Sequence, residues 1–151
     1  MLAEWSDVGL RRLAWESDGF VPSLRKKLHN CHSEWQCLLD NLLSDYQRSN
    51  WNAAMAIQID VQGLPAFTCN ILLACRKIAF GSLKTYGELA SEAGRPAAAR
   101  GVGQAMAKNP IPIIVPCHRV VGARGALTGY SGAGGIETKR RLLLQEGLTN
   151  V

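Results

Sequence analysis

The sequence has 151 residues, of which 47% are hydrophobic and 19% are charged. This composition is typical of a folded globular protein and excludes a disordered chain, and the length allows one ordinary domain or two very small ones. No apolar run approaches the roughly 20 residues that cross a bilayer, and the first residues lack the basic-then-apolar pattern of a signal peptide. We therefore expect a cytoplasmic protein that has no membrane partner.

Positive charge is concentrated in the second half of the chain. Residues 1–75 hold 6 Lys and Arg against 8 Asp and Glu, whereas residues 76–151 hold 11 against 4, and the net charge is +5. A basic half beside a mildly acidic half favours a polyanionic partner such as a nucleic acid. A solvated surface without a partner explains the charge equally well, so charge alone leaves both interpretations open.

The cysteine pattern argues for free thiols. The five cysteines are Cys31, Cys37, Cys69, Cys75 and Cys117. An odd number in a chain without a signal peptide predicts reduced thiols. A zinc site built from His29, Cys31, His32 and Cys37 is a competing interpretation, but the segment has the pattern of one helix on which these ligands do not converge. We predict no metal site.

The first part of the chain predicts a strand, a helix and a second strand. Residues 9–16 partly alternate between apolar and polar side chains, which favours a strand. Apolar side chains at steps of three and four over residues 24–46 favour an amphipathic helix. Residues 54–61 alternate again and predict a strand, and residues 62–65 have the composition of a connector. We therefore expect a small N-terminal domain over residues 1–63.

Residues 64–151 predict a second domain that is mainly helical. Apolar side chains recur on one helical face from Phe67 to Ile78, and Phe80-Gly81 ends the run. The expected fold class is therefore mixed α and β, with a small N-terminal unit followed by a helical C-terminal domain.

Two short helices around a turn are expected next. Thr85 and Glu88 have the spacing of a capping box, which predicts a helix that starts there and stops at Gly94. Pro96 suits the first position of another helix, predicted over residues 97–108. Such a pair has the outline of a helix-turn-helix, although many helix pairs bind nothing.

The second helix of this pair is unusually small-sided. Alanine and glycine dominate its first half, and Arg100 is the one long charged side chain in the middle. A smooth helix of this kind can approach a nucleic acid groove and insert Arg100 into it. Tight packing of the small faces against another helix is the alternative, and the pattern alone favours that alternative slightly.

The segment from Asn109 to Arg119 has the composition of a stiff and buried connection. It contains three prolines, which exclude a helix and disfavour a central strand, and most of its other residues are apolar. We predict an extended rod that carries Cys117 and His118 to a fixed position. A thiol reacts as the thiolate and an imidazole can accept its proton, yet a buried cysteine beside a hydrogen-bonded histidine is the structural alternative for an isolated pair.

A glycine-rich loop follows over residues 122–135. Glycine permits close approach of the backbone, so amides around Tyr130 and Ser131 can contact a planar base. The same loop is equally compatible with an ordinary flexible connection.

The last helix is predicted from Glu137 to Glu146, with Gly147 directly after it. Its basic first turn, Lys139–Arg141, opposes the helix dipole, which suggests that a partner uses these charges. Glu146 stands at the opposite end, where a carboxylate is also unfavourable. A charged residue at a helix end where the helix dipole disfavours it is a candidate for a functional role, such as orienting His118.

The order of several motifs resembles that of the O6-alkylguanine-DNA alkyltransferases. Pro116-Cys117-His118-Arg119-Val120 is similar to the active-site signature of that family, and the resemblance covers residues 65–147. The other matching motifs are Phe80-Gly81, Thr85–Ala90, Ala98–Gly103, Ala105-Met106, Lys108–Pro110, Gly129–Gly132 and Glu146-Gly147. The resemblance implies a ribonuclease-H-like N-terminal unit and a C-terminal domain with a helix-turn-helix. The N-terminal part matches weakly and is short for the family.

The resemblance also implies chemical roles. Cys117 is the alkyl acceptor, His118 the base that acts through water, and Glu146 the acid that orients it. Asn109 supports this geometry, and Tyr86 donates a proton toward the leaving base. The reaction is a direct displacement that needs no cofactor and no metal.

DNA contacts and a base pocket are implied in the same way. The protein is expected to bind double-stranded DNA as a monomer, through the minor groove, with the alkylated guanine flipped out of the helix. The DNA-contacting residues are Tyr86, Arg95, Ala99, Arg100 and Gly103, with Arg100 filling the gap left by the flipped nucleotide. The base pocket is formed by Met106, Val120, Tyr130 and Ser131.

The expected function is therefore stoichiometric, irreversible transfer of a methyl or larger alkyl group from O6 of guanine to Cys117, with O4 of thymine as a second candidate substrate. A catalytically silent, lesion-binding relative is the main alternative, and the presence of Cys117 argues against it. A sequence-reading regulator would need polar side chains on the recognition helix, and a cysteine hydrolase would need an oxyanion hole and many turnovers.

Overall fold

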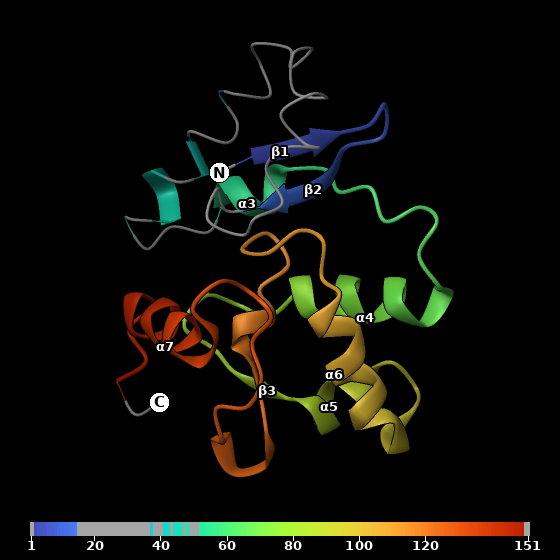
Figure 1. The fold of residues 1–151 in the computed structure, drawn as a ribbon, viewed down its shortest axis with the longest axis vertical. Helices are drawn as coiled ribbons and strands as arrows, with labels where there is room; N and C mark the ends of the chain where they lie inside the picture. Colours follow the sequence, from blue (N-terminus) through green and yellow to red (C-terminus); the bar gives the residue numbers. More distant parts are fainter. Residues whose placement is uncertain are drawn as a thin grey trace.

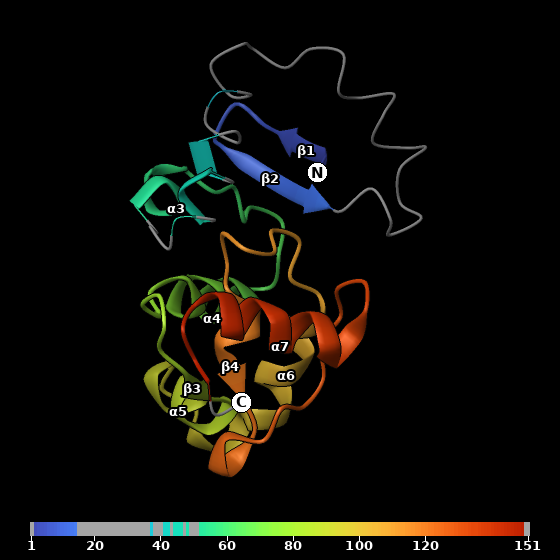
Figure 2. The same ribbon diagram turned by 90° about the vertical axis from the view of Figure 1, so that its left-hand side faces the viewer.

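The computed structural model describes residues 2–14, 37, 41–42, 44–46, 48 and 52–149. Figure 1 shows a smaller N-terminal part beside a larger, mainly helical C-terminal part, and Figure 2 shows the same division from the side. The N-terminal elements are β1 (Leu2–Trp5), β2 (Leu10–Ala14) and α3 (Asn52–Ala56). The C-terminal elements are α4 (Ala66–Arg76), β3 (Lys84–Thr85), α5 (Tyr86–Glu92), α6 (Ala99–Ala107), β4 (Val120–Val121) and α7 (Gly135–Gln145). In the described part of the chain, none of the helices has the length and apolar character needed to span a membrane.

The N-terminal sheet is built around β2. Strands β1 and β2 pair antiparallel, and the backbone around Ile59 lies along the other edge of β2. The Leu10 amide donates to the Gln58 carbonyl at 2.8 Å, and the Asp60 amide donates to the Leu10 carbonyl at 2.8 Å. The predicted strand over residues 9–16 is confirmed for its central part, whereas β1 was not expected from the sequence.

The predicted strand over residues 54–61 is wrong for its first half, because residues 52–56 form helix α3. Met55 is 49% exposed, whereas Ile57 is buried, so the two residues do not share one face as a strand would require. The Arg76 guanidinium of α4 donates to the Ala54 and Met55 carbonyls at 3.1 and 3.0 Å, so a side chain from the C-terminal part satisfies carbonyls at the end of this helix. A short alternating pattern cannot foresee such a tertiary contact.

The predicted helix over residues 24–46 lies largely outside the described residues. Those that are described within it, at positions 37, 41–42 and 44–46, are helical. Leu42 and Tyr46 are buried. The residues of the competing zinc interpretation also lie outside the described part of the chain, except Cys37, which is an exposed free thiol.

Helices α4, α5 and α6 pack together in the C-terminal part (Figure 1). Their buried faces contribute Ile71, Leu72, Cys75, Leu89, Ala90, Val102, Ala105 and Met106 to one core. Helix α4 ends at Arg76 and not at Phe80, because the chain leaves the helix in a turn while Ile78 still packs into the core.

The predicted pair of short helices is present. The Thr85 hydroxyl accepts from the Glu88 amide at 3.1 Å, and the Glu88 carboxylate accepts from the Thr85 amide, so the capping box is confirmed. Gly94 follows α5 with a positive φ of 70°. The predicted helix over residues 97–108 is divided, because Pro96–Ala98 form a 3-10 helix before α6 starts.

The packing interpretation of the small-sided helix is confirmed on one face, and the approach to a nucleic acid groove stays a prediction for another face. A Cβ on Gly101 would lie 3.3 Å from the Phe67 ring, so this face packs closely against α4. Ala99, Arg100 and Gly103 instead line an open pocket.

Residues 111 and 113–119 are buried as predicted, but the segment does not form an extended rod. Ile113 has a positive φ of 73°, and the Val115 amide donates back to the Ile111 carbonyl at 2.9 Å, so the segment turns on itself. Cys117–Arg119 then form a 3-10 helix that leads into β4, which pairs in parallel with β3. Proline restricts only its own φ and the residue before it, which leaves room for this turn.

Helix α7 ends as predicted. Leu148 donates to the Leu143 carbonyl and Gly147 to the Leu144 carbonyl, each at 3.0 Å, and Gly147 has a φ of 85°. This is a Schellman motif, and it fixes Glu146 as the C-cap residue.

We expect the Thr85→Ala variant to lose about 1 kcal/mol of unfolding free energy, because the N-cap acceptor of α5 is removed. Urea denaturation measures this loss. Ser91→Ala in the same helix is the control, since its exposed hydroxyl donates to the Gly87 carbonyl within the helix and its removal should change stability by less than about 0.5 kcal/mol. Equal losses in the two variants would contradict the capping role of Thr85.

Candidate active site

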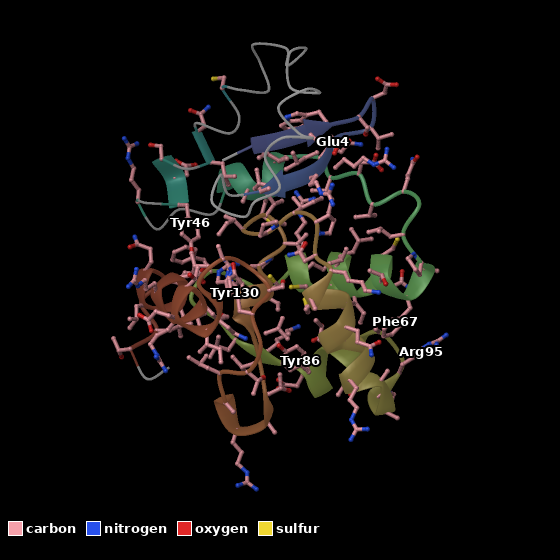
Figure 3. The ribbon with its side chains drawn as sticks, viewed as in Figure 1. Glu4, Tyr46, Phe67, Tyr86, Arg95 and Tyr130 are labelled. Carbon is pink, nitrogen blue, oxygen red and sulfur yellow. The ribbon has the colours of Figure 1, made fainter. Side chains whose placement is uncertain are left out.

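Cys117 lies at a pocket of about 550 Å³ that opens between helix α6 and the loop after β4. The 3-10 turn holds the residue with 6% of its surface exposed. The lining residues are Tyr86, Ala99, Arg100, Gly103, Met106, Ala107, Cys117, Thr128, Gly129, Tyr130 and Ser131. Figure 3 labels two of these residues, Tyr86 and Tyr130, within the C-terminal part. A planar ligand that enters this pocket reaches a single buried thiol among the residues that line it.

The surroundings of Cys117 act on its thiol in two directions. Burial raises the pKa of the Cys117 thiol, whereas the Asn109 side chain and the Lys139 charge lower it. The Asn109 amide donates to the Val115 carbonyl at 2.8 Å, and its oxygen accepts from the Ile111 amide at 3.0 Å. Asn109 therefore holds the turn that precedes Cys117.

His118, which follows Cys117 in the chain, is fully buried. Its Nε2 lies 2.7 Å from Glu146 Oε1, and its Nδ1 has no hydrogen-bond partner among the described residues. Burial lowers the pKa of His118, while Glu146 opposes that effect. A neutral imidazole that donates Nε2–H to the carboxylate keeps an unprotonated Nδ1, which is the form that can accept a proton.

Glu146 accepts hydrogen bonds from several directions. Arg119 donates from Nε at 2.8 Å and from its terminal nitrogen at 3.0 Å, the Tyr46 hydroxyl donates at 3.2 Å, and the Gly81 amide donates at 3.2 Å. Burial alone would raise the pKa of Glu146, but the hydrogen bonds and charges of His118 and Arg119 lower it to about 2. The carboxylate is therefore ionised and held rigidly.

Sequence reasoning missed two contributors to this cluster and one further buried residue of the site. Arg119 stands inside the signature motif, but nothing in the motif assigns it to Glu146. Tyr46, labelled in Figure 3, comes from the N-terminal part. Its ring makes an edge-to-face contact with Phe80 at 6.0 Å between ring centres, and its hydroxyl bonds the carboxylate. No sequence signal links residues 100 positions apart.

Lys139 is the third missed residue, and it corrects the prediction for the basic start of α7. Its side chain is fully buried, and Nζ donates to the Val120 carbonyl at 2.6 Å and the Thr128 carbonyl at 3.0 Å. Arg140 and Arg141 pair with Glu137. The unfavourable position of these charges is therefore explained within the chain and does not require an external partner.

Val120 is the predicted pocket residue that the structure does not place in the pocket lining. Its side chain is fully buried, and Lys139 already uses its carbonyl.

Tyr86 does line the pocket, and its hydroxyl donates to the Thr128 carbonyl at 3.3 Å. Burial raises the pKa of the Tyr86 phenol, so it stays protonated at neutral pH.

Arg95 lies apart from the other predicted DNA-contacting residues. Its guanidinium stacks 5.6 Å from the centre of the Phe67 ring, and both residues lie on one side of the molecule in Figure 3. Arg100 is exposed at the rim of the pocket, beside Ala99.

In the described part of the chain, no three His, Cys, Asp or Glu side chains are arranged to hold a metal ion.

Comparison with known proteins assigns this arrangement to a family. A family profile described as 6-O-methylguanine DNA methyltransferase, DNA binding domain, matches residues 66–148. The methylated-DNA–protein-cysteine methyltransferase of Salmonella typhimurium is 38% identical over 145 residues, which cover 91% of this chain and 83% of that protein. The chain belongs to the methylated-DNA–protein-cysteine methyltransferase family.

Solved structures of the family share the fold. The crystal structure of Mycobacterium tuberculosis OGT in complex with DNA superposes with a TM-score of 0.73 at 33% identity, covering 95% of this chain and 84% of that one. The O6-methylguanine-DNA methyltransferase of Pyrococcus kodakaraensis superposes with a TM-score of 0.69 at 27% identity, covering 97% and 89%. The small N-terminal sheet and the helical C-terminal part of this chain therefore match the fold of these two structures.

We expect the Glu146→Gln variant to lose more stability at pH 7 than at pH 3. An unfolded glutamate has a pKa of about 4.3, and the folded value is about 2. A depressed pKa stabilises the fold above the unfolded value, and this contribution is lost as the pH falls toward the folded value. The expected loss at pH 7 is about 3 kcal/mol or more, since the buried Arg119 charge loses its carboxylate.

Urea denaturation of both proteins at the two pH values measures this difference. Other acidic groups are common to the variant and the parent, so their contributions cancel. A loss of the same size at pH 3 and pH 7 would contradict the ionised state of Glu146 in the folded protein.

Proposed function

We propose that this protein repairs DNA by transferring a methyl or larger alkyl group from O6 of guanine to Sγ of Cys117, once per molecule. The observation that carries the proposal is the buried Cys117 thiol at the base of an open pocket, with His118 and Glu146 hydrogen-bonded behind it. The family's activity is methyl transfer from DNA to a protein cysteine, and Cys117 is the cysteine that this pocket exposes to a ligand.

The chemistry follows from the proton acceptor beside the thiol. His118 Nδ1 takes the thiol proton through a water, and Glu146 stabilises the imidazolium that forms. The thiolate forms a bond to the alkyl carbon, the bond from that carbon to O6 breaks, and its electron pair stays on O6. The Tyr86 hydroxyl then donates a proton toward the leaving base. The product is a thioether that water does not hydrolyse, so each molecule reacts once.

The DNA side of the proposal rests on the helix pair α5–α6 as a helix-turn-helix in the minor groove. A lesion inside a duplex cannot reach a buried thiol, so the nucleotide must flip out at a cost of a few kcal/mol. Arg100, exposed at the pocket rim, fills the gap and offsets part of that cost. Ala99, Gly103 and Tyr86 line the same pocket as Arg100, and Arg95, which stacks on Phe67, is proposed as a more distant DNA contact.

The base side of the proposal uses Met106, Tyr130 and Ser131 as walls for the flipped guanine. The Cys117 and Val120 carbonyls accept from the guanine amino group. A carbonyl has two lone pairs, so Val120 can accept this bond in addition to the one from Lys139.

The remaining parts of the proposal concern organisation. We place the domain boundary between residues 63 and 64, with a ribonuclease-H-like unit before it. The protein acts in the cytoplasm as a monomer, without a metal or cofactor. O4-alkylthymine is a second candidate substrate of the same pocket, since its oxygen also leaves as an anion.

Mass spectrometry tests the transfer directly. After mixing with duplex DNA that carries O6-methylguanine, the peptide with Cys117 should gain one methyl group, and the reaction should stop at one methyl per protein. Cys117→Ala should bind the duplex and transfer nothing. Cys69→Ala, which removes another free thiol, is the matched control and should still react. Methyl groups that stay on bound DNA would identify a silent lesion-binding protein, and repeated turnover would identify a hydrolase.

Arg100→Ala should slow repair in duplex DNA by about tenfold, which corresponds to about 1.4 kcal/mol of the flipping cost. The same variant should react with free O6-methylguanine base at close to the parent rate, because a free base needs no flipping. Single-turnover rates on the two substrates measure the difference. Equal slowing on both substrates would exclude the proposed gap-filling role.

A further inference from the structure

One oxygen of the Glu146 carboxylate faces more hydrogen-bond donors than it has lone pairs. The Tyr46 hydroxyl, His118 Nε2 and a terminal nitrogen of Arg119 lie 3.2, 2.7 and 3.0 Å from Oε1. A carboxylate oxygen has two lone pairs, so these three donors share two acceptor positions. The distance from the Tyr46 hydroxyl is long for a hydroxyl that donates to a carboxylate, as expected for a shared oxygen. The hydrogen bonds of Tyr46 and His118 therefore compete.

The other carboxylate oxygen of Glu146 cannot take up the excess. Oε2 accepts from Arg119 Nε at 2.8 Å and from the Gly81 amide at 3.2 Å, which uses both of its lone pairs. Glu146, Tyr46 and His118 are all buried, so bulk water screens the competition little. The number of acceptor positions therefore links His118 to Tyr46, a residue of the N-terminal part that is labelled in Figure 3.

The phenol and the carboxylate keep their protonation states at neutral pH. Burial and the Glu146 charge raise the pKa of Tyr46, so its hydroxyl remains a donor. Burial alone would raise the pKa of Glu146, but the hydrogen bonds and charges of His118 and Arg119 hold it at about 2, so the carboxylate remains an acceptor. His118 is therefore the member of this group that can gain or lose a proton near neutral pH.

We propose that Tyr46 is a positioning residue of the transfer reaction, whose hydroxyl takes a share of Glu146 Oε1 and thereby limits how strongly the carboxylate draws a proton to His118. This inference rests on the proposed transfer to Cys117 and assigns the N-terminal part a role in it. His118 accepts the thiol proton while it is neutral, so a weaker pull from Glu146 keeps the imidazole ready to act as a base at lower pH. Through Tyr46, the N-terminal part sets the proton affinity of the base.

Tyr46→Phe tests the competition, because it removes the hydroxyl and keeps the ring. With one donor fewer, Oε1 binds the imidazolium of His118 more strongly, and the pKa of His118, which burial lowers in the parent, rises. The single-turnover rate of methyl transfer falls at low pH as His118 takes up a proton. The midpoint of this fall should move to higher pH by about 0.5 to 1 unit, as expected when a hydrogen bond to a charged group is lost. Above both midpoints the two rates should agree within about threefold.

Two measurements give this midpoint independently. The transfer rate is measured on free O6-methylguanine base, because DNA binding carries a pH dependence of its own. The ring carbon signals of His118, followed by NMR in the protein without DNA, give the midpoint without any transfer. Arg119, Lys139 and Tyr130, which also act on His118 or Tyr46 through their charges, are present in both proteins. The difference between parent and variant therefore isolates the hydroxyl.

A second substitution changes the hydrogen bond in the opposite direction. 3-Fluorotyrosine in place of Tyr46 has a more acidic phenol and is a stronger donor, so the midpoint should move to lower pH. Leu42→Val is the matched control. Leu42 lies four residues before Tyr46, is also buried and helical, and carries no side-chain donor. This variant should reduce the stability of the protein and leave the midpoint unchanged.

Two results for Tyr46→Phe would overturn the proposal. A lower rate at high pH with an unchanged midpoint would show that Tyr46 supports packing alone. A midpoint that moves to lower pH would show that the hydroxyl assists His118 and does not compete with it. If the parent protein transfers no methyl group, the proposed function fails, whereas the NMR midpoint still decides whether Tyr46 competes with His118.

Discussion

The buried carboxylate of Glu146 is the group on which the rest of the site depends. An ionised carboxylate in a protein interior is costly unless a cation and hydrogen-bond donors surround it. Arg119 supplies the cation with two hydrogen bonds, and His118 uses the same oxygen as Tyr46. The fixed carboxylate in turn fixes the imidazole of His118, and with it Nδ1, the ring nitrogen that does not bond Glu146. The end of α7 and the turn at Cys117 are therefore held together by one charge cluster.

A second buried charge, on Lys139, connects the pocket wall to its base. Its ammonium group joins the Val120 carbonyl, just after the reactive turn, to the Thr128 carbonyl in the glycine-rich loop. Tyr86 donates to the same Thr128 carbonyl, and the Lys139 nitrogen lies 5.9 Å from the centre of its ring. These contacts hold a glycine-rich loop at a defined distance from the thiol. A loop with that much backbone freedom needs such anchors to form a pocket of constant shape.

The N-terminal part contributes to the site in two places. Tyr46 reaches the Glu146 cluster, and β2 forms one wall of a smaller cavity that Cys117 also lines. The Leu13 amide of β2 also donates to the Pro110 carbonyl at 2.8 Å, which attaches the sheet to the segment that leads to the thiol. In Figures 1 and 2 the loop after α6 extends to β2 in both views. The small sheet is thus part of the surroundings of Cys117.

The sequence by itself determined the local features, because their physical causes lie within a few residues. The capping box at Thr85, the Gly147 terminus of α7 and the burial of the proline-rich segment all follow from short-range chemistry, and the family signature around Cys117 identified the family. The turn at Ile113, the helix over residues 52–56 and the roles of Lys139, Arg119 and Tyr46 were decided only by the tertiary structure. Apart from the turn at Ile113, each of these depends on a partner far away in the chain, such as Arg76 for α3 or Glu146 for Tyr46. Buried charges in particular cannot be paired from sequence, because folding selects the partner through desolvation and geometry, which no local pattern encodes.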